Sequence, residues 1–257
     1  MNRPRIIPVM LISERRAVKT VRFAEPRYIG DPVNTAKIFS DKGVDELIVL
    51  DISPSPRKGG LDFSYISRIA EEAFMPFSFG GGIVSLKDAE KLFNLGIEKV
   101  VLGWNGEDTL NLMTEIACVY GVQAVAICLD VSAEKKLLKK LNKKGVCVEQ
   151  RANAAQLISR IQDAGGGEII LQNVDLDGMM NGMDYALIDE VCSSVRLPVV
   201  ALGGAGSLDD LVKASIHGAN AVASGSSFVF HDSGRAVLIN YPTDSEILTS
   251  FEKMKDK

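Results

Sequence analysis

A segment of this chain occurs twice, and the second copy follows the first at a constant distance. The residues from Pro76 to Gly103 correspond to those from Pro198 to Gly225, each 122 positions later. Both copies contain a pair of glycines, a Ser-Leu-x-Asp sequence, and a glycine that separates two apolar stretches. An internal repeat restricts the possible folds more than any other feature, because each copy must form the same structural unit.

The same offset extends toward the N-terminus of each copy. Gly43 corresponds to Gly165, and the apolar run that begins at Glu46 corresponds to the run that begins at Glu168. In each copy an apolar run ends in glycines and leads into an amphipathic segment, a glycine and a second apolar run. Each half of the chain therefore predicts a strand, a tight turn, a helix and a further strand.

The start of the helix in each copy has the spacing of a capping box. Ser85 and Asp88 in the first copy, and Ser207 and Asp210 in the second, are three residues apart. In a capping box the serine hydroxyl and the acidic side chain each accept a hydrogen bond from a free backbone N–H of the first turn. We therefore expect each glycine turn to lead directly into a helix N-terminus.

Apolar runs that predict buried strands recur along the whole chain, and helical patterns separate them. The strands are expected at residues 5–12, 46–52, 77–79, 99–102, 124–130, 168–174, 199–202 and 221–224. Helices are expected at 33–42, 63–73, 110–120 and 154–164, after Ser85 and Ser207, and at 237–253 with an interruption near Pro242. This alternation indicates a parallel sheet, so we predict an α/β fold with one domain over residues 1–257, a (β/α)8 TIM barrel with a two-fold half-barrel repeat.

Composition excludes several classes of protein. The net charge is −4, which gives no electrostatic footprint for nucleic acid, and no apolar run reaches the roughly 18 residues of a membrane span. The first residues lead straight into a strand, so we expect no signal peptide and a cytoplasmic protein without nucleic-acid or membrane partners. The cysteines, at positions 118, 128, 147 and 192, lack the spacing of metal ligands. We expect reduced thiols, no metal site and no cofactor.

One segment is unusually rich in lysine. Residues 132–147 contain six lysines within ten positions, directly after the strand expected at 124–130. One interpretation is a solvated flap or hairpin. The other is a lid that attracts an anionic substrate, because the C-terminal end of a barrel strand is where such barrels keep their active sites.

Carboxylates follow several of the expected strands at their C-terminal ends. Asp51, Asp130, Asp175 and Asp177 all end apolar runs at what would be the same rim of the barrel. Carboxylates at this rim are candidates for acid–base or binding roles. The alternative is that they cap the following helices or hold the backbone of loops.

Glycines at two of the strand ends are a second signal. Gly80 to Gly82 and the run from Gly203 to Gly206 allow a ligand to approach the backbone N–H groups, and a helix N-terminus follows each. Two such turns at related strands suit a substrate with a phosphate at each end. The alternative is that these glycines only let a helix pack closely on a strand.

Seven motifs in this order and spacing carry a family resemblance over nearly the whole chain. They are IIPxxL, GDPV, ELIVLDI, GGGI, the aspartate that ends the fifth expected strand, DLDG and GGAGSL. Together they resemble HisF, the cyclase subunit of imidazole glycerol phosphate synthase. The resemblance implies a lyase of histidine biosynthesis, in which ammonia from a glutaminase partner travels along the barrel axis to a two-phosphate substrate.

The resemblance also assigns residues at the rim. Asp130 matches the second of two catalytic aspartates, whereas Leu11 occupies the position of the first and cannot transfer a proton. The resemblance implies substrate and phosphate binding by Asp51, Gly82, Asp177, Gly178, Gly204, Gly225 and Ser226. Trp104, which follows Gly103, and Leu202 stand where the family has small polar residues. Losing one general acid or base typically lowers a rate by roughly 10² to 10⁴, so we expect impaired cyclase turnover.

At the opposite end the resemblance is complete. Arg5, Glu46, Lys99 and Glu168 match the family's four charged residues at the ammonia entrance, on the face where the HisH-like glutaminase binds. The resemblance therefore implies that these residues gate an ammonia channel. The alternative is an inherited layer of salt bridges that plugs the barrel floor.

Four segments resemble one branch of the family more than the histidine enzymes. They are VKTVRF, PRYIGDP, VDELIVLDI and VLINYP. That branch is associated with acetamidino modification of bacterial surface sugars, with ammonia delivered to a separate amidotransferase. This paralogue is the favoured interpretation; the alternatives are a working cyclase with Asp130 as the main acid–base group, and a noncatalytic scaffold that docks the glutaminase.

Overall fold

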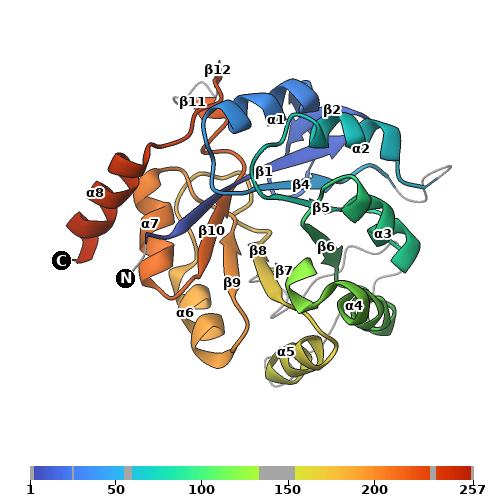
Figure 1. Cartoon of the computed structure of the whole chain (residues 1–257). Coiled ribbons are helices and arrows are strands. Elements are labelled where there is room, and N and C mark those ends of the chain that lie inside the picture. Colours follow the sequence, from blue (N-terminus) through green and yellow to red (C-terminus); the bar gives the residue numbers. More distant parts are fainter. Residues whose placement is uncertain (1–2, 25, 55–59, 133–153, 232–235, 256–257) are drawn as a thin grey trace.

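A closed barrel of eight parallel strands forms the centre of the protein. The computed structural model describes residues 3–24, 26–54, 60–132, 154–231 and 236–255. The barrel strands are β1 (Arg5–Ser13), β4 (Leu47–Asp51), β5 (Phe77–Gly80), β6 (Lys99–Gly103), β7 (Val125–Val131), β8 (Glu168–Asn173), β9 (Val199–Leu202) and β10 (Ala221–Ser224). They pair in chain order, and β1 closes the ring by pairing with β10 (Figure 1). The predicted (β/α)8 barrel is confirmed.

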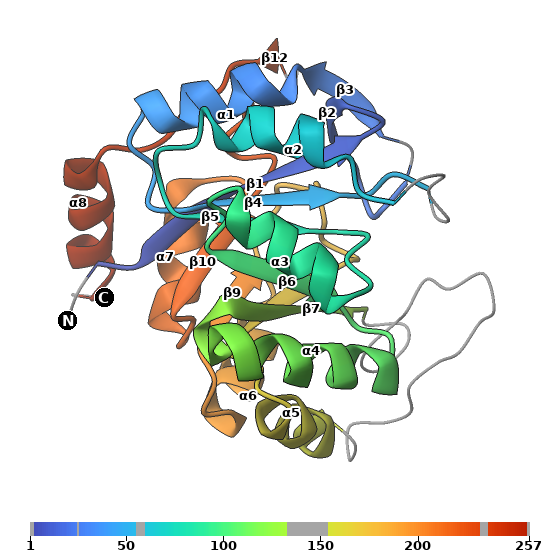
Figure 2. The ribbon, with the colours of Figure 1, turned by 45° about the vertical axis from the view of Figure 1, so that its right-hand side comes forward.

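Helices cover the outside of the barrel (Figure 2). Most follow the ranges that the sequence predicts, but α6 (Tyr185–Ser194) lies between two predicted strands where no helix is predicted. The helices are α1 (Pro32–Asp41), α2 (Phe63–Ala70), α3 (Leu86–Asn94), α4 (Glu107–Tyr120), α5 (Ala154–Asp163), α6 (Tyr185–Ser194), α7 (Leu208–Ile216) and α8 (Asp244–Lys255). A short 3-10 helix, η1 (Val122–Ala124), precedes β7. None of the helices within the described residues has the length and apolar character needed to cross a bilayer.

Three further segments differ from the prediction in their secondary structure or lie outside the described residues. The connection after β1 forms two antiparallel strands, β2 (Arg16–Lys19) and β3 (Arg27–Gly30), which extend the sheet beyond β1. The last helix begins at Asp244 and not at residue 237, because Ala236–Val237 form a strand, β12, that pairs with β11 (Phe230–His231). The lysine-rich segment lies outside the described residues from position 133 to 153.

The capping box at the start of the helix differs between the two copies of the repeat. At α7 the Ser207 hydroxyl accepts from the Asp210 N–H, and the Asp210 carboxylate accepts from the N–H of Ser207, which completes a capping box. At α3 the Ser85 hydroxyl accepts from the Asp88 N–H, but the Asp88 carboxylate accepts from the N–H of Val84. The predicted capping box is therefore complete only in the second copy.

An outer and an inner apolar core flank the strands, and a small third cluster lies around Val131, Leu171, Val191 and Val199. The larger core lies between the sheet and the helices and includes Phe39, Phe79 and Met113, all fully buried. The smaller core fills the inside of the barrel with alternate strand residues such as Ile7, Ile48 and Val200. Leu11, Leu50 and Cys128 pack against one side of this inner core. The axis of the barrel is thus lined by apolar side chains.

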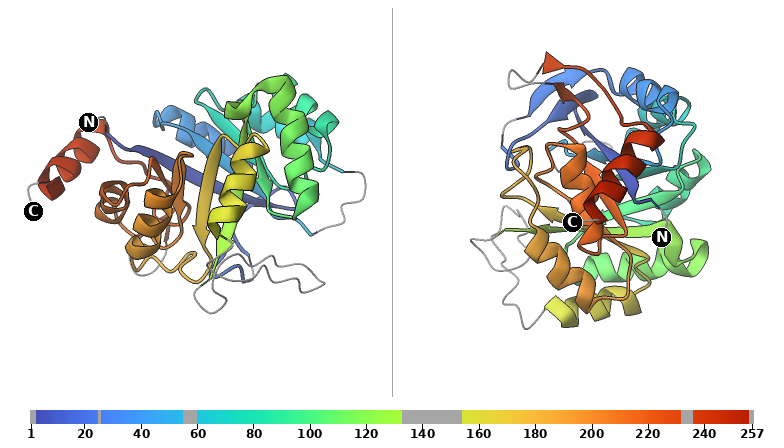
Figure 3. Two further views of the ribbon diagram at one scale, coloured as in Figure 1. Left: turned by 90° about the horizontal axis from the view of Figure 1, so that it is seen from below. Right: turned by 90° about the vertical axis from the view of Figure 1, so that its left-hand side faces the viewer.

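The two ends of the described chain lie on the same side of the barrel. Figure 3 shows α8 beside the point where β1 begins. Arg3 binds the carboxylates of Asp45 and Asp244, and the Tyr241 hydroxyl donates to the carbonyl of Ile6 at 2.8 Å. These contacts attach the C-terminal segment to the N-terminal ends of the strands.

Candidate functional site

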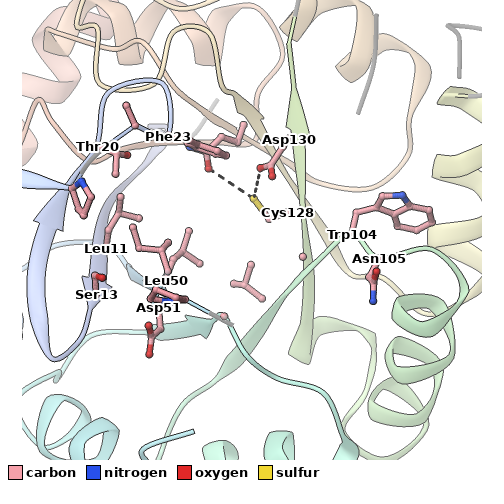
Figure 4. A pocket seen from close by; sticks show the side chains of 18 residues that line it. Leu11, Ser13, Thr20, Phe23, Leu50, Asp51, Trp104, Asn105, Cys128 and Asp130 are labelled. Carbon is pink, nitrogen blue, oxygen red and sulfur yellow. Dashed lines mark hydrogen bonds between the residues drawn. The ribbon is translucent and has the colours of Figure 1, made fainter. Parts of the chain in front are cut away.

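A cavity of about 700 Å³ opens at the C-terminal ends of the barrel strands. Most of its lining comes from β1, β4, β6 and β7 and from the connection between β2 and β3 (Figure 4). The lining residues are Leu11, Ser13, Thr20, Phe23, Ala24, Pro26, Leu50, Asp51, Ile52, Pro54, Gly81, Val101, Gly103, Trp104, Asn105, Cys128, Asp130 and Gln172. The cavity lies where a (β/α)8 barrel carries its active site.

Asp130 is the most buried carboxylate of this cavity. It follows Leu129 near the end of β7, and its Oδ1 lies 3.8 Å from the Cys128 thiol, which donates to it. Burial raises the pKa of Asp130 to about 6, the thiol contact opposes the rise, and the negative charge of Asp177 adds to it. A carboxyl with such a pKa can both take up and release a proton near neutral pH.

Asp177 lies next to this site, in the loop after β8. Its carboxylate accepts hydrogen bonds from the Thr20 hydroxyl at 2.9 Å and from the Gln172 amide at 3.4 Å. Burial raises the pKa of Asp177, although the hydrogen bonds from Thr20 and Phe23 and the charge of Lys19 oppose the rise. Asp177 therefore links β8 to the connection that follows β2.

Lys19 is a buried cation that was not among the candidate site residues expected from the sequence. It is the last residue of β2, and its ammonium donates to the carbonyl of Val9 at 2.6 Å. Burial lowers the pKa of Lys19 to about 7, and the charge of Asp177 opposes this shift. The one available signal was its place in the VKTVRF segment, because its burial depends on the distant residues Val9 and Asp177.

Leu11 occupies the predicted position at the rim. It lies on β1 between Val18 of β2 and Leu50 of β4, and both leucines line the cavity. Leu202 is buried in the inner core below. Leu11 and Leu50 therefore form an apolar part of the cavity wall, and neither side chain can donate or accept a proton.

Asp51 also lines the cavity, at the end of β4. Its Oδ1 accepts from the N–H of Ser53 at 2.9 Å, as expected of a carboxylate that holds a loop. Gly81 passes so close to the Asp51 carbonyl that a side chain there would overlap it. Gly82, at a positive φ of 76°, follows directly but does not line the cavity.

The remaining predicted binding residues lie apart from the cavity lining. Gly178 packs against the Thr20 carbonyl, Gly204 against the Gly182 carbonyl and Gly225 against the Lys19 ammonium, so a side chain at any of them would overlap its neighbour. Ser226 is buried beside Gly225. Asp175 accepts from the Ser132 hydroxyl at 2.8 Å and does not line the cavity either. None of these residues lines the cavity that holds Asp51 and Asp130, although Gly178 contacts the lining residue Thr20.

Trp104 stands at the edge of the cavity. Its ring packs in part against the outer core, and Figure 4 shows it turned away from Leu11, Leu50 and Asp130. The side chain narrows the rim beside β6 but leaves the centre of the cavity open. Its neighbour Asn105 donates its backbone N–H to the Thr109 hydroxyl at 2.8 Å.

The four predicted channel residues meet at the other end of the barrel. Arg5 donates to Glu46 at 3.0 Å and to Glu168 at 2.6 Å, and Lys99 donates to Glu168 at 2.6 Å and to Glu46 at 3.4 Å. The Ser78 hydroxyl adds a hydrogen bond to Glu46 at 2.8 Å. The two glutamates are buried, whereas Arg5 is partly exposed on the outer face. We call these four charged residues the floor ring.

Within the described residues no group of histidine, cysteine, aspartate or glutamate side chains could hold a metal ion. The described cysteines, Cys118, Cys128 and Cys192, carry free thiols.

Comparison with known proteins identifies the family. The model for "Histidine biosynthesis protein" matches residues 5–233. Relatives in Pseudomonas aeruginosa and Vibrio vulnificus, named "Putative imidazole glycerol phosphate synthase subunit" hisF2 and hisF3, are 41% and 40% identical over 94% and 96% of this chain and 97% and 95% of their own. The Helicobacter hepaticus protein "Imidazole glycerol phosphate synthase subunit HisF" is 34% identical over 95% of this chain and 96% of its own. The chain therefore belongs to the HisF family.

Proposed function

We propose that this chain is a HisF-like barrel that receives ammonia from a glutaminase at its N-terminal face and conducts it along the barrel axis to the cavity. We further propose that it is the paralogue that serves acetamidino modification of surface sugars, with the cavity as the exit toward a separate amidotransferase. The observation that carries the proposal is the floor ring, in which all four charged residues meet, whereas Leu11 stands where the resemblance implies the first catalytic aspartate.

The inner core supports a path between the two ends. Directly above the floor ring the barrel interior is lined by residues such as Ile7, Ile48 and Val200, and Leu11 and Leu50 continue this lining into the cavity. An apolar passage favours neutral ammonia over ammonium, because transfer of a charge out of water is costly. Ammonia that moved along the axis would pass between these apolar side chains, where bulk water is excluded.

Exposed apolar side chains support a partner on the N-terminal face. Phe74 precedes β5 and is 88% exposed, and Val119 and Val122, before β7, are also largely exposed. These residues lie where helices end and strands begin, which is the face that carries the floor ring. Large apolar residues that cluster around a functional opening are typical of protein interfaces.

Lys99→Ala tests the gating role. In the complex with the glutaminase and with an ammonia acceptor present, we expect ammonia to escape to bulk solvent in the variant and product formation from glutamine to fall. Bulk ammonia is measured with a coupled dehydrogenase, and glutamate formation gives the total. Lys87→Ala on the exposed surface of α3 is the matched control. Product formation equal to wild type with no escape of ammonia would refute the gating role.

Turnover of the histidine-pathway two-phosphate substrate with ammonium salt tests the paralogue against an ordinary cyclase. We expect wild-type turnover to lie roughly 10² to 10⁴ below that of a family member with both aspartates, since Leu11 cannot transfer a proton. Robust wild-type turnover would make the chain a working cyclase. Recovery in Leu11→Asp would assign the loss to that position.

The scaffold alternative has its own test. A scaffold that only activates the glutaminase should keep both partner activity and product formation in Asp130→Asn, whereas an ammonia-delivering site should lose product formation. Gly204→Val is unsuitable for this purpose because its side chain would overlap the Gly182 carbonyl and disturb the fold.

A further inference from the structure

The C-terminal segment with the VLINYP motif reaches the floor of the barrel. Leu238 and Asn240 donate their backbone N–H groups to the carbonyls of Val229 and Phe228, each at 2.9 Å, which fixes the segment along the chain that follows β10. The Tyr241 side chain comes next and is buried, and its ring packs against the Phe228 ring with 5.5 Å between the centroids. The proposed function assigns no role to this motif.

The Tyr241 hydroxyl joins two backbone segments. It donates to the Ile6 carbonyl at 2.8 Å and accepts from the Asp45 N–H at 3.4 Å. Burial raises the pKa of Tyr241, so the hydroxyl keeps its proton and remains a donor at neutral pH. Ile6 directly follows Arg5, and Asp45 directly precedes Glu46. The side chains of Arg5 and Glu46 pair at 3.0 Å, so one oxygen connects the two backbone segments that carry this ion pair.

Side-chain hydrogen bonds replace sheet pairing at this level of the barrel. The pairing of β1 with β4 begins at Val9 and Ile48, beyond the residues of the floor ring. Toward β4, the Ile6 N–H donates to the Asp45 carboxylate at 3.0 Å, and the Ile6 carbonyl accepts from Tyr241. These two bonds therefore set the spacing between the start of β1 and the residues that precede β4.

Arg3 provides a second attachment of the C-terminal segment to Asp45. Its guanidinium donates to both Asp45 oxygens, at 2.8 and 2.5 Å, and lies 3.0 Å from the Asp244 carboxylate at the start of α8. Close control of this region matters because a buried ion pair is favourable only when its geometry is good. A displacement of either segment would weaken the attraction that offsets desolvation of the buried Glu46.

We infer that Tyr241 is a positioning residue for the floor ring: its hydroxyl fixes the spacing of the segments that carry Arg5 and Glu46. The inference rests on the proposed function, which makes the floor ring the gate for ammonia, and it adds a control on that gate from the C-terminal segment. Without the hydroxyl the Ile6 carbonyl loses a buried donor, the two segments can separate, and the contact between Arg5 and Glu46 lengthens.

Tyr241→Phe tests this role because it removes the hydroxyl and keeps the ring that packs on Phe228. In the complex with the glutaminase and an ammonia acceptor, product formation from glutamine is compared with product formation from ammonium salt, which needs no transfer from the glutaminase. We expect the ratio of the two rates to fall at least about threefold, while the rate with ammonium salt stays within about twofold of wild type. A purely structural role would lower both rates together and leave their ratio unchanged.

Tyr185→Phe is the matched control, because the Tyr185 hydroxyl donates to Asp210 at 3.1 Å between the outer helices α6 and α7. It should keep the wild-type ratio. A wild-type ratio in Tyr241→Phe, together with a lowered ratio in Lys99→Ala, would overturn the inference and leave the proposed function intact. Circular dichroism verifies that each variant is folded, as expected for the loss of one hydrogen bond.

NMR of the full chain without its partner tests the positioning role separately from gating. With arginine labelled in the guanidinium group, Tyr241→Phe should shift the Arg5 signals, whereas Tyr185→Phe should not. Arg5 signals that are the same in Tyr241→Phe and wild type would overturn the inference. Shifted Arg5 signals together with a Lys99→Ala complex that does not leak would refute the gate and leave the positioning role intact.

Discussion

The charged residues at the floor and at the rim of this barrel differ in how completely they are paired. At the floor, two cations and two anions satisfy one another within the floor ring, and Ser78 supplies a further donor to Glu46. At the rim, Asp130 is desolvated and, within the described residues, accepts a hydrogen bond from the weak Cys128 thiol donor, while Leu11 lines the same cavity. The charges of the floor ring satisfy one another, whereas Asp130 at the rim can still accept a hydrogen bond from a donor. The difference indicates that an anion or cation has little to gain at the floor ring, whereas a ligand with a hydrogen-bond donor can gain a partner at Asp130.

The largest effect is expected where the floor ring is broken. Glu168→Ala removes the partner of both Arg5 and Lys99, and breaking a buried ion pair typically costs roughly 3 to 5 kcal/mol. Urea denaturation measures the free energy of unfolding. Glu252→Ala, on the exposed side of α8, is the matched control and should change it by less than about 0.5 kcal/mol. A loss below about 1 kcal/mol in Glu168→Ala would mean that water already satisfies the ring.

A paired replacement separates stability from gating. Lys99→Met combined with Glu168→Leu removes one cation and one anion together, and such apolar replacements of buried pairs are often close to neutral for stability. We expect a folded barrel of near wild-type stability whose complex leaks ammonia. A stable double variant that retains full channelling would show that the floor ring is only structural.

The rim should respond in the opposite direction. Because burial raises the pKa of Asp130 to about 6 from its ordinary 3.8, the folded state binds the proton more tightly than the unfolded state. The free energy of unfolding therefore falls as pH rises from about 4 to about 6, and the full cost of the buried charge is present above that range. At pH 8, Asp130→Asn should stabilise the protein by up to about 3 kcal/mol.

Thermal unfolding of wild type and Asp130→Asn across pH 3 to 8 measures this cost. The two proteins should have nearly the same stability near pH 3, where the aspartate is protonated in both states, and diverge as the pH rises. A difference that is constant with pH would show that Asp130 does not titrate in this range.

The smallest effect belongs to the hydroxyl that supports the floor. Ser78→Ala removes the donor to Glu46 but leaves Arg5 and Lys99 in place, so we expect a loss of about 1 kcal/mol. Ser193→Ala, with an exposed hydroxyl on α6, is the control for urea denaturation. A loss of more than about 3 kcal/mol would indicate that Ser78 holds the whole ring in position.

The sequence predicts the eight barrel strands but not the additional strands β2 and β3. The eight barrel strands are apolar runs buried on both faces, and the repeat supports their order, so even the short strand β9 could be predicted. The strands β2 and β3 were missed because β2 is only four residues long, β3 is largely exposed, and their pairing depends on β1. Local pattern cannot reveal a strand whose partner supplies most of its stability.

The candidate site was likewise predictable only in part from the sequence. The positions of Leu11 and Asp130 at strand ends followed from the chain alone, because strand ends in a parallel barrel share one rim. The burial of Lys19 did not, because it depends on contacts with residues distant in the sequence, Val9 and Gly225. The meeting of the floor ring was implied by resemblance and not by any local pattern.

Closure of the barrel by β1 and β10 has a consequence for how the protein is made. Arg5 to Pro8 pair with Ala221 to Ser224, so one edge of the first strand stays open until nearly the entire chain has left the ribosome. The ion pair between Arg5 and Glu168 likewise cannot form until Glu168 has been synthesised. An unpaired strand edge invites association with other chains, and such distant contacts form slowly. The open edge of β1 must therefore be kept from pairing with other chains during translation. A partner or chaperone that covers β1 would increase the yield of folded protein.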